Sequence, residues 1–384
     1  MRFEFATATR IIFGAGTLKQ VGPIAAETGR HALVVTGLAT ALTQPLLDLL
    51  AAQGIDCEMF PVCGEPTLEV VRQGIQHVRL ATCDLVIGFG GGSAIDAGKA
   101  IAALMTNSGD LLDYLEVIGK GKPITQPAAP YIAVPTTAGT GAEVTRNAVL
   151  ASPEHRVKVS LRSPHMLPRA ALVDPELTYS LPPEVTASTG LDALVQLVEP
   201  FVSIRANPMT DAFCRDGMHR AARSLRRVYE YGNDIQARED MALASLLGGL
   251  ALANAGLGAV HGIASVVGGM FPAPHGAVCA RLLPHVMEIN VRALQARQPG
   301  SDALRHFDEV AQILTGNGKA TAGDGVAWVQ GLCQVLKVPP LSAYSMTSGD
   351  LPVVVEKAAA TSSTKANPLP LTPDEMRLAL EQAM

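Results

Sequence analysis

The sequence lacks paired cysteines, a surplus of positive charge and an apolar leader. Its six cysteines are scattered and form no C-x-x-C pair, which excludes the usual zinc-finger and thioredoxin-type motifs. We therefore expect reduced, mostly buried thiols in a cytoplasmic protein. The formal net charge is −5 at pH 7, with lysine and arginine dispersed along the chain. This charge pattern gives no electrostatic footprint for nucleic acid or for an anionic membrane.

No membrane-spanning or secreted form is expected either. The N-terminal stretch MRFEFATATR has no long apolar core of the kind that a signal peptide needs. Residues 246–271 form the most apolar segment and are long enough to cross a membrane. They are rich in glycine and alanine, contain Asn254 and His261, and lack basic flanks. We interpret them as helices buried in a protein core.

The chain is long enough for two domains, since it has 384 residues, of which 48% are hydrophobic. In the first half, the apolar runs RHALVVTG, CDLVIGFGGG and YIAVPTTAGTG alternate with helical patterns such as ALTQPLLDLLAAQG. This alternation predicts a Rossmann-like parallel sheet covered on both faces, with ligands at the carboxyl ends of the strands. Later residues are mainly helical in pattern. We predict an α/β dinucleotide-binding domain over residues 1–182 and an all-helical metal and substrate domain over residues 183–384.

A glycine-rich turn, GFGGGSAIDAGKA, is the first candidate site. Gly91 and Gly92 let backbone N–H groups approach an anion, the helix that follows adds partial positive charge, and Ser93 can cap that helix. A pyrophosphate would fit there, although the turn matches neither G-x-G-x-x-G nor the Walker pattern. A tight turn without a ligand is the alternative. A second turn, PTTAGTGAEVTRN, carries hydroxyls that could reach a ribose, a phosphate or a nicotinamide amide: Thr136, Thr137 and Thr140.

Polar residues within apolar helices form the next candidate. In GLDALVQLVEP, Asp192 and Gln196 lie one turn apart on the same helix face. A carboxylate in such apolar surroundings needs a positive partner. His261 and His275 lie fourteen residues apart in another apolar stretch, each followed by glycine. Either the histidines are satisfied core residues or, together with Asp192, they form a divalent-metal site.

Together these stretches resemble the iron-containing (group III) alcohol dehydrogenase family over nearly the whole chain. The resemblance is carried by TRIIFGAGTL, GGGSAIDAGKA, PTTAGTGAEVT, LVDPEL, TGLDAL, VHG, PHG, LLPHV and NPLPLT. It implies a dinucleotide domain followed by a helical metal domain, the architecture shared with dehydroquinate synthase, and usually a homodimer. It also implies reversible hydride transfer between NAD or NADP and a small alcohol or aldehyde. A divalent metal, Fe²⁺ or Zn²⁺, would act as Lewis acid in the interdomain cleft.

The resemblance also assigns roles to residues. Asp192, His261 and His275 fall on three of the family's four metal-ligand positions and would be the catalytic residues. Gln196 occupies the fourth, where the family normally has histidine, and could offer an amide oxygen, a weaker ligand than imidazole. The residues that would hold the cofactor are Gly37, Gly91, Gly92, Ser93, Asp96, Thr136, Thr137, Thr140, Asn147, Lys158 and Thr178.

Further departures from the family pattern concern the cofactor and the pocket. Many relatives have aspartate at the position of Gly37, where it repels a 2′-phosphate, so glycine makes NADP usable. Glu65 lies where relatives often have asparagine. Ser265 replaces a second histidine that often follows the first by four residues, and is either a small residue between helices or a means of enlarging the pocket. We interpret Cys279 as a core residue.

Two other functions stay open. One is a metal-independent reductase resembling maleylacetate reductase, in which His261, His275 and Lys158 would hold a substrate carboxylate and stabilise developing charge. The other is a catalytically silent nucleotide-binding protein. A lyase of the dehydroquinate-synthase type would need the full metal set and a cluster of lysine and arginine for phosphate, which the sequence lacks.

Overall fold

The computed structural model describes residues 2–384, and these divide into two compact units. An α/β unit contains Ala6–Thr137 and Gly141–Tyr179, and a helical unit contains residues 2–5, Ala138–Thr140 and Ser180–Met384. The boundary between the two units, at Ser180, lies close to the expected boundary after residue 182. The loop that holds Thr140 groups with the helical unit although the strand before it belongs to the α/β unit.

A six-stranded parallel sheet forms the centre of the α/β unit, in the order β1-β8-β5-β4-β2-β3. Its strands are β1 (Arg10–Phe13), β2 (His31–Thr36), β3 (Asp56–Pro61), β4 (Leu85–Gly90), β5 (Tyr131–Pro135) and β8 (Ala170–Val173). From β2 onward this is the 2-1-3-4-5 order of doubly wound folds, so the topological switch point lies between β2 and β4. The predicted Rossmann-like parallel sheet is confirmed.

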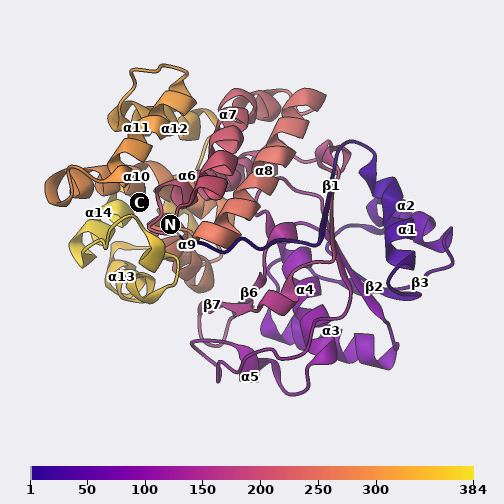
Figure 1. Ribbon diagram of the computed structural model, residues 1–384. Coiled ribbons are helices and arrows are strands. Elements are labelled where there is room, and N and C mark those ends of the chain that lie inside the picture. The colour runs from indigo at the N-terminus through magenta and orange to yellow at the C-terminus, as the bar shows by residue number, and fades with distance from the viewer. Residues whose placement is uncertain (1) are drawn as a thin grey trace. The chain divides into compact units, whose positions relative to one another are not determined.

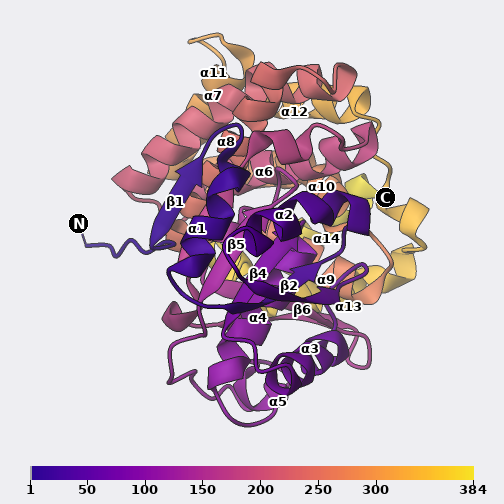
Figure 2. The ribbon, with the colours of Figure 1, turned by 90° about the vertical axis from the view of Figure 1, so that its right-hand side faces the viewer.

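Helices cover both faces of this sheet. Leu33 and Val35 pack with α3 (Leu68–Leu80) and α4 (Gly92–Thr106), whereas Ala32 and Val34 pack with α1 (Val21–Ala26) and α2 (Thr40–Ala51). Successive strand residues point to opposite faces, so a strand covered on both sides must be apolar throughout. Figure 2 shows α3 and α4 on the opposite side of the sheet from α1 and α2. The short helix α5 (Leu111–Tyr114) and the antiparallel pair β6 (Asn147–Ser152) and β7 (Val157–Arg162) complete the named elements.

Tyr131 holds α4 close against the sheet. A side-chain carbon built on Gly88 would lie 2.2 Å from the Tyr131 hydroxyl oxygen, and one built on Gly98 would lie 3.0 Å from its ring. The Tyr131 hydroxyl donates to the carbonyl oxygen of Ile95 at 2.7 Å. Because two glycines make room for one buried ring, the strand–turn–helix segment that carries the glycine-rich turn is fixed in place.

Figure 1 shows the helical unit, whose helices are coloured from rose to yellow, with α6 labelled among them. This unit contains no strand among the residues described. Side chains on almost every side of α6 are buried, because the helix packs against α7, α8 and α10. Close approach of α6 and α7 depends on Gly190, where a side-chain carbon would lie 2.3 Å from Leu225 Cδ1. The helices are α6 (Pro183–Val202), α7 (Pro208–Glu230), α8 (Ile235–Ala255), α9 (Ala259–Met270), α10 (His275–Arg297), α11 (Asp302–Thr315), α12 (Ala322–Val335), α13 (Leu351–Ala360) and α14 (Pro373–Ala383).

The most apolar segment of the sequence, residues 246–271, forms the C-terminal half of α8 and the whole of α9. Most of its apolar side chains are buried, as the sequence interpretation predicted. No single helix within residues 2–384 is long and apolar enough to cross a membrane. The two helices together would pass on length and composition, but they are bent by 99° at the break between them.

Candidate functional site

One face of α6 carries three buried polar side chains. Asp192, Gln196 and Glu199 are spaced i, i+4 and i+7, which places them on one side of the helix. Their exposed fractions are only 2%, 2% and 5%. Buried polar groups are costly unless they meet partners, so this face must be matched by other polar residues. The sequence analysis missed Glu199, although its spacing of seven from Asp192 was the available signal.

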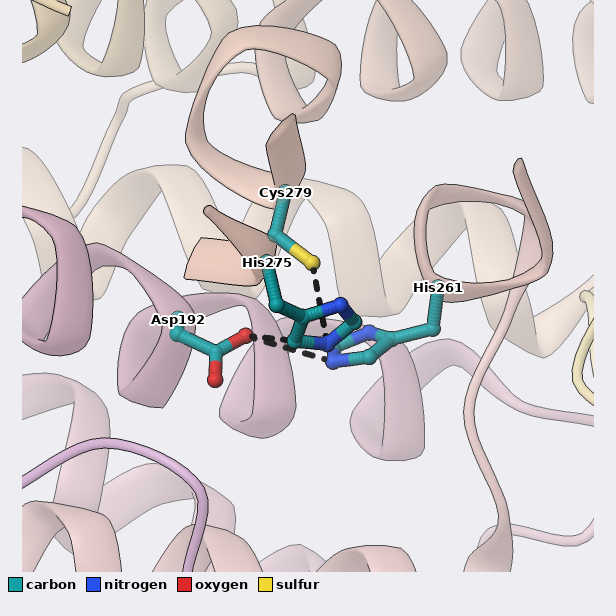
Figure 3. A group of neighbouring side chains, drawn as sticks. All are labelled: Asp192, His261, His275 and Cys279. Carbon is teal, nitrogen blue, oxygen red and sulfur yellow. Dashed lines mark hydrogen bonds and ion pairs between the residues drawn. The ribbon is translucent and has the colours of Figure 1, made fainter. Parts of the chain in front are cut away.

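Two histidines and a cysteine meet Asp192 from α9 and α10, as Figure 3 shows. Asp192 Oδ1 lies 3.4 Å from His261 Nε2 and 3.9 Å from His275 Nε2. Cys279, one turn after His275 on α10, places its Sγ 3.6 Å from His275 Nε2. One potential ligand atom from each of the four residues lies within 4.8 Å of all the others. The structure thus brings together Asp192, His261 and His275, the three residues that the sequence analysis predicted as strong metal ligands.

This spacing fits a divalent cation. Metal–ligand bonds of about 2.0–2.3 Å in a tetrahedral site place the ligand atoms about 3.3–3.8 Å from one another. The separations of 3.4 Å and 3.6 Å lie within that range, and that of 3.9 Å lies just beyond it. In addition, Asp192 Oδ1 is buried without a hydrogen bond, and it points at the imidazoles. Carboxylate, imidazole and thiolate are donors that Zn²⁺ and Fe²⁺ accept, so the residues present fit the predicted metal.

Glu199 orients His261 from the side opposite Asp192. Its Oε2 lies 2.7 Å from His261 Nδ1, and its Oε1 accepts the N–H of Val260 at 2.7 Å. A carboxylate can only accept, so the proton of a neutral imidazole is on Nδ1 and the lone pair of Nε2 faces Asp192. Carboxylate–histidine pairs of this kind fix both the tautomer and the orientation of metal-binding imidazoles.

The electrostatics of the cluster favour positive charge beside Asp192. Burial raises the pKa of Asp192, but the imidazoles of His261 and His275 outweigh burial and hold the pKa below its usual value. For His261, burial lowers the pKa, while Cys279, Asp192 and Glu199 raise it and prevail. Burial raises the pKa of Cys279 to about 12. The buried, anionic carboxylate of Asp192 therefore stabilises positive charge beside it. That charge can be a protonated imidazole or a bound divalent ion.

Gln196 lies beside the cluster and holds Asp192. Its Nε2 donates to Asp192 Oδ2 at 3.1 Å and to the carbonyl oxygen of Gly139 at 3.2 Å. Its Oε1 is buried without a hydrogen bond. With Oδ2 engaged in this way, Oδ1 of Asp192 is the oxygen presented to the imidazoles. The interpretation of Gln196 as an oxygen ligand stays a prediction.

Ser265 takes part in a local contact on α9. Its hydroxyl donates to the carbonyl oxygen of Gly262 at 2.9 Å. Close packing on this helix depends instead on Gly262, where a side-chain carbon would lie 1.9 Å from Thr364 Oγ1. The idea that Ser265 enlarges the substrate pocket stays a prediction.

In the α/β unit, the glycine-rich turn lies at the carboxyl end of β4. Gly91 is the N-cap of α4, so the first N–H groups of that helix have no partner within it and its positive end is available to an anion. Thr137, after the neighbouring strand β5, lies beside the turn: a side-chain carbon on Gly91 would be 3.4 Å from Thr137 Cγ2. The predicted residues that share this edge of the sheet are Gly37, Gly91, Gly92, Ser93, Thr136 and Thr137.

Gly37 follows β2, across the switch point from the glycine-rich turn. A side-chain carbon at this position would lie 2.6 Å from the carbonyl oxygen of Val62, a backbone atom that cannot easily move. Close packing against Val62 is therefore enough to explain why this position is glycine. It also leaves the end of β2 without a carboxylate.

Asp96 and Asn147 are used in contacts around a buried lysine. Asp96 Oδ2 accepts the N–H of Val149 at 2.9 Å, and Oδ1 lies 3.5 Å from Lys99 Nζ. Lys99 also donates to the carbonyl oxygens of Asn147, at 2.6 Å, and of Ala142, at 2.7 Å. These contacts tie α4 to β6, so Asp96 has a structural function whether or not it contacts a cofactor.

The remaining cofactor candidates are dispersed. The side chain of Lys158 on β7 is 3% exposed, and its Nζ pairs with Glu65 Oε1 at 2.8 Å. The Thr178 hydroxyl donates to the carbonyl oxygen of Pro175 at 2.8 Å. Thr140 belongs to the helical unit. Contact of these residues with a cofactor stays a prediction.

Comparison with known proteins connects this geometry to one family. The profile "Iron-containing alcohol dehydrogenase" matches residues 8–175, and the C-terminal profile of the same family matches residues 186–384. Alcohol dehydrogenase 4 of Schizosaccharomyces pombe is 35% identical, over 97% of this chain and 87% of its own. The crystal structure of a 1,3-propanediol oxidoreductase superposes with a TM-score of 0.92 at 34% identity, covering 100% of both chains. Sulfoacetaldehyde reductase from Bifidobacterium kashiwanohense, solved with NAD⁺, superposes with a TM-score of 0.86 at 27% identity, covering 100% and 99%.

Proposed function

Because the chain belongs to the iron-containing alcohol dehydrogenase family, we propose that it transfers hydride reversibly between a nicotinamide cofactor and a small alcohol or aldehyde. In this proposal the α/β unit binds NAD or NADP, and the helical unit holds a divalent metal. The observation that carries the proposal is the largely buried cluster in which Asp192 Oδ1 lies 3.4 Å and 3.9 Å from two imidazole nitrogens. A structural core does not need a carboxylate and two histidines at ligand spacing.

The glycine-rich turn would bind the cofactor pyrophosphate. Backbone N–H groups at Gly92 and Ser93 open α4, and Gly91 permits close approach because it has no side chain. Thr136 and Thr137 follow the adjacent strand and would donate hydroxyls to the nicotinamide half. This places the dinucleotide at the switch point of the sheet, where doubly wound folds bind their ligands.

The helical cluster would hold the metal. Asp192 supplies negative charge, and His261 and His275 supply neutral nitrogen donors. When bound, a divalent metal supplies Lewis-acid polarisation of the substrate oxygen, which stabilises the charge that develops during hydride transfer. Glu199 keeps the Nδ1 proton on His261, so Nε2 stays a donor. Gln196 holds the second oxygen of Asp192 and thereby keeps the carboxylate from rotating.

Cofactor choice is expected to be permissive at the end of β2. With Gly37 there, no carboxylate opposes the 2′-phosphate of NADP. Turnover with NADPH and with NADH, each at saturating substrate, measures this directly. We expect NADPH to be accepted; strong selectivity for NADH would show that Gly37 does not decide the preference.

We place this enzyme in the cytoplasm as a homodimer. Its six cysteines are all free thiols, which suits a reducing compartment, and the family resemblance implies the dimer. The mass of the purified protein in solution, measured by light scattering, tests the assembly, and a monomer at working concentration would contradict it.

The test of the function is a nicotinamide absorbance assay on a panel of small alcohols and aldehydes. We expect turnover of at least one substrate pair in both directions. Loss of turnover in Asp192→Asn with an unchanged fold, judged by circular dichroism, would assign the activity to the cluster. Absence of turnover across the panel with intact cofactor binding would instead support a silent nucleotide-binding protein. Undiminished turnover in metal-free protein on a carboxylate-bearing carbonyl would support a metal-independent reductase.

A further inference from the structure

Cys279 occupies a position that its role as a core residue does not explain. It lies one turn after His275 on α10, is fully buried, and points its sulfur toward the imidazole of His275, beside Asp192 and His261, as Figure 3 shows. Its Sγ lies 3.6 Å from His275 Nε2 and within 4.8 Å of the ligand atoms of Asp192 and His261. The spacing i, i+4 on one helix is a common way to place two ligands on the same metal.

Two observations indicate that the cluster needs another donor. Gln196, which the resemblance places at the family's fourth ligand position, directs its amide nitrogen at Asp192, so it offers the cluster no nitrogen donor in place of the imidazole. Asp192 Oδ1 is buried without a hydrogen bond and points at the same centre as the cysteine sulfur. Three donor atoms, from Asp192, His261 and His275, therefore surround a centre whose fourth neighbour is the Cys279 sulfur.

We propose that the Cys279 thiolate is a metal ligand that replaces the imidazole absent at position 196. The protein's ligand set is then Asp192, His261, His275 and Cys279, which keeps four protein ligands. Binding breaks the S–H bond and forms a sulfur–metal bond, and the proton is released to solvent with no change of oxidation state. This inference rests on the proposed function, because it assumes that the cluster holds a divalent metal.

The ligand set has a consequence for metal choice. A thiolate is a softer donor than imidazole and carries a full negative charge, so the protein supplies two anionic ligands in place of one. Soft donors favour Zn²⁺ and disfavour hard ions such as Mg²⁺ and Mn²⁺. We therefore expect this chain to retain zinc in preference to the harder ions.

Other buried cysteines of the helical unit provide matched controls. Cys333 is also buried, but its sulfur approaches a backbone carbonyl oxygen, that of Ala280, at 3.4 Å. Cys214 on α7 is fully buried as well. Neither belongs to the ligand cluster. Replacing either one changes a buried thiol without changing the proposed ligand set.

The test is cobalt substitution of the full-length protein. A cysteine thiolate bound to Co²⁺ gives an intense charge-transfer absorption in the near ultraviolet, which oxygen and nitrogen ligands do not. We expect this band in the native sequence and in Cys333→Ser, and its loss in Cys279→Ser. Competition with a chromophoric chelator should show that Cys279→Ser weakens Zn²⁺ binding by at least about 100-fold, the upper end of the effect of removing an outer-shell partner.

A double variant separates lost ligation from damaged packing. Cys279→Ser combined with Gln196→His restores an imidazole at the family's position, so Zn²⁺ affinity should recover while the charge-transfer band stays absent. One Co²⁺ per chain without the band in the native sequence would overturn the inference, and metal-dependent turnover in that sample would leave the proposed function standing. If no divalent ion binds at all, both the ligand assignment and the metal-dependent function are wrong.

Discussion

Replacing Glu199 with glutamine should weaken metal binding without unfolding the protein. The substitution keeps the size of the side chain, and the amide oxygen can still accept the N–H of Val260, which the carboxylate accepts at 2.7 Å. The amide nitrogen is then left facing His261 Nδ1, where the carboxylate Oε2 lies at 2.7 Å. Because that nitrogen donates, Nδ1 must become the acceptor and the proton moves to Nε2. A protonated Nε2 cannot bind a metal.

The expected loss is that of an outer-shell partner. Such changes lower metal affinity about 10- to 100-fold, which corresponds to about 1.4–2.7 kcal/mol. Zn²⁺ dissociation constants for the native sequence and for Glu199→Gln, measured by chelator competition, test this. Glu184→Gln is the control, because Glu184 lies on the same helix but is exposed. A dissociation constant within twofold of the native value would refute the claim that Glu199 sets the tautomer of His261.

Two further predictions concern the α/β unit. Lys99→Met should lower the free energy of unfolding by about 3–5 kcal/mol, because it leaves the buried Oδ1 of Asp96 without its cation. Denaturant melts of Lys99→Met and of the exposed-site control Lys19→Met measure this, and equal effects would contradict it. Burial raises the pKa of Glu143 to about 7 from 4.5. The folded carboxyl therefore keeps its proton after the unfolded one has lost it, and stability falls as pH rises through this window. Glu143→Gln should match the native stability below pH 4.5 and exceed it above pH 7 by up to about 3 kcal/mol; parallel pH dependences would refute this.

The fold was predictable where local patterns alone determine the structure. Apolar runs such as residues 31–36 and 85–90 are buried on both faces and could only belong to a covered parallel sheet. The order of the strands in the sheet was harder to predict from the sequence, because it depends on which two strands each helix connects. The loop 138–140 grouped with the helical unit for a similar reason: its partner, the amide of Gln196, is far away in the sequence.

The candidate site was predictable in part. Asp192 and the two histidines were identified by their residue types, because polar groups in apolar helices need an explanation. Glu199 and Cys279 were missed as site residues, although each is at helical spacing from a residue that was found. What the sequence could not show is direction: the orientation of the Gln196 amide follows from hydrogen bonds to Asp192 and Gly139 that depend on tertiary packing.

The most direct test of the central claim is elemental analysis of protein purified without added metal, paired with turnover before and after chelation. The structure predicts about one divalent ion per chain, loss of turnover on chelation, and its return when Zn²⁺ or Fe²⁺ is added back. Full turnover by protein shown to contain no metal would contradict the account, because Asp192, His261 and His275 would then have to act on the substrate by themselves.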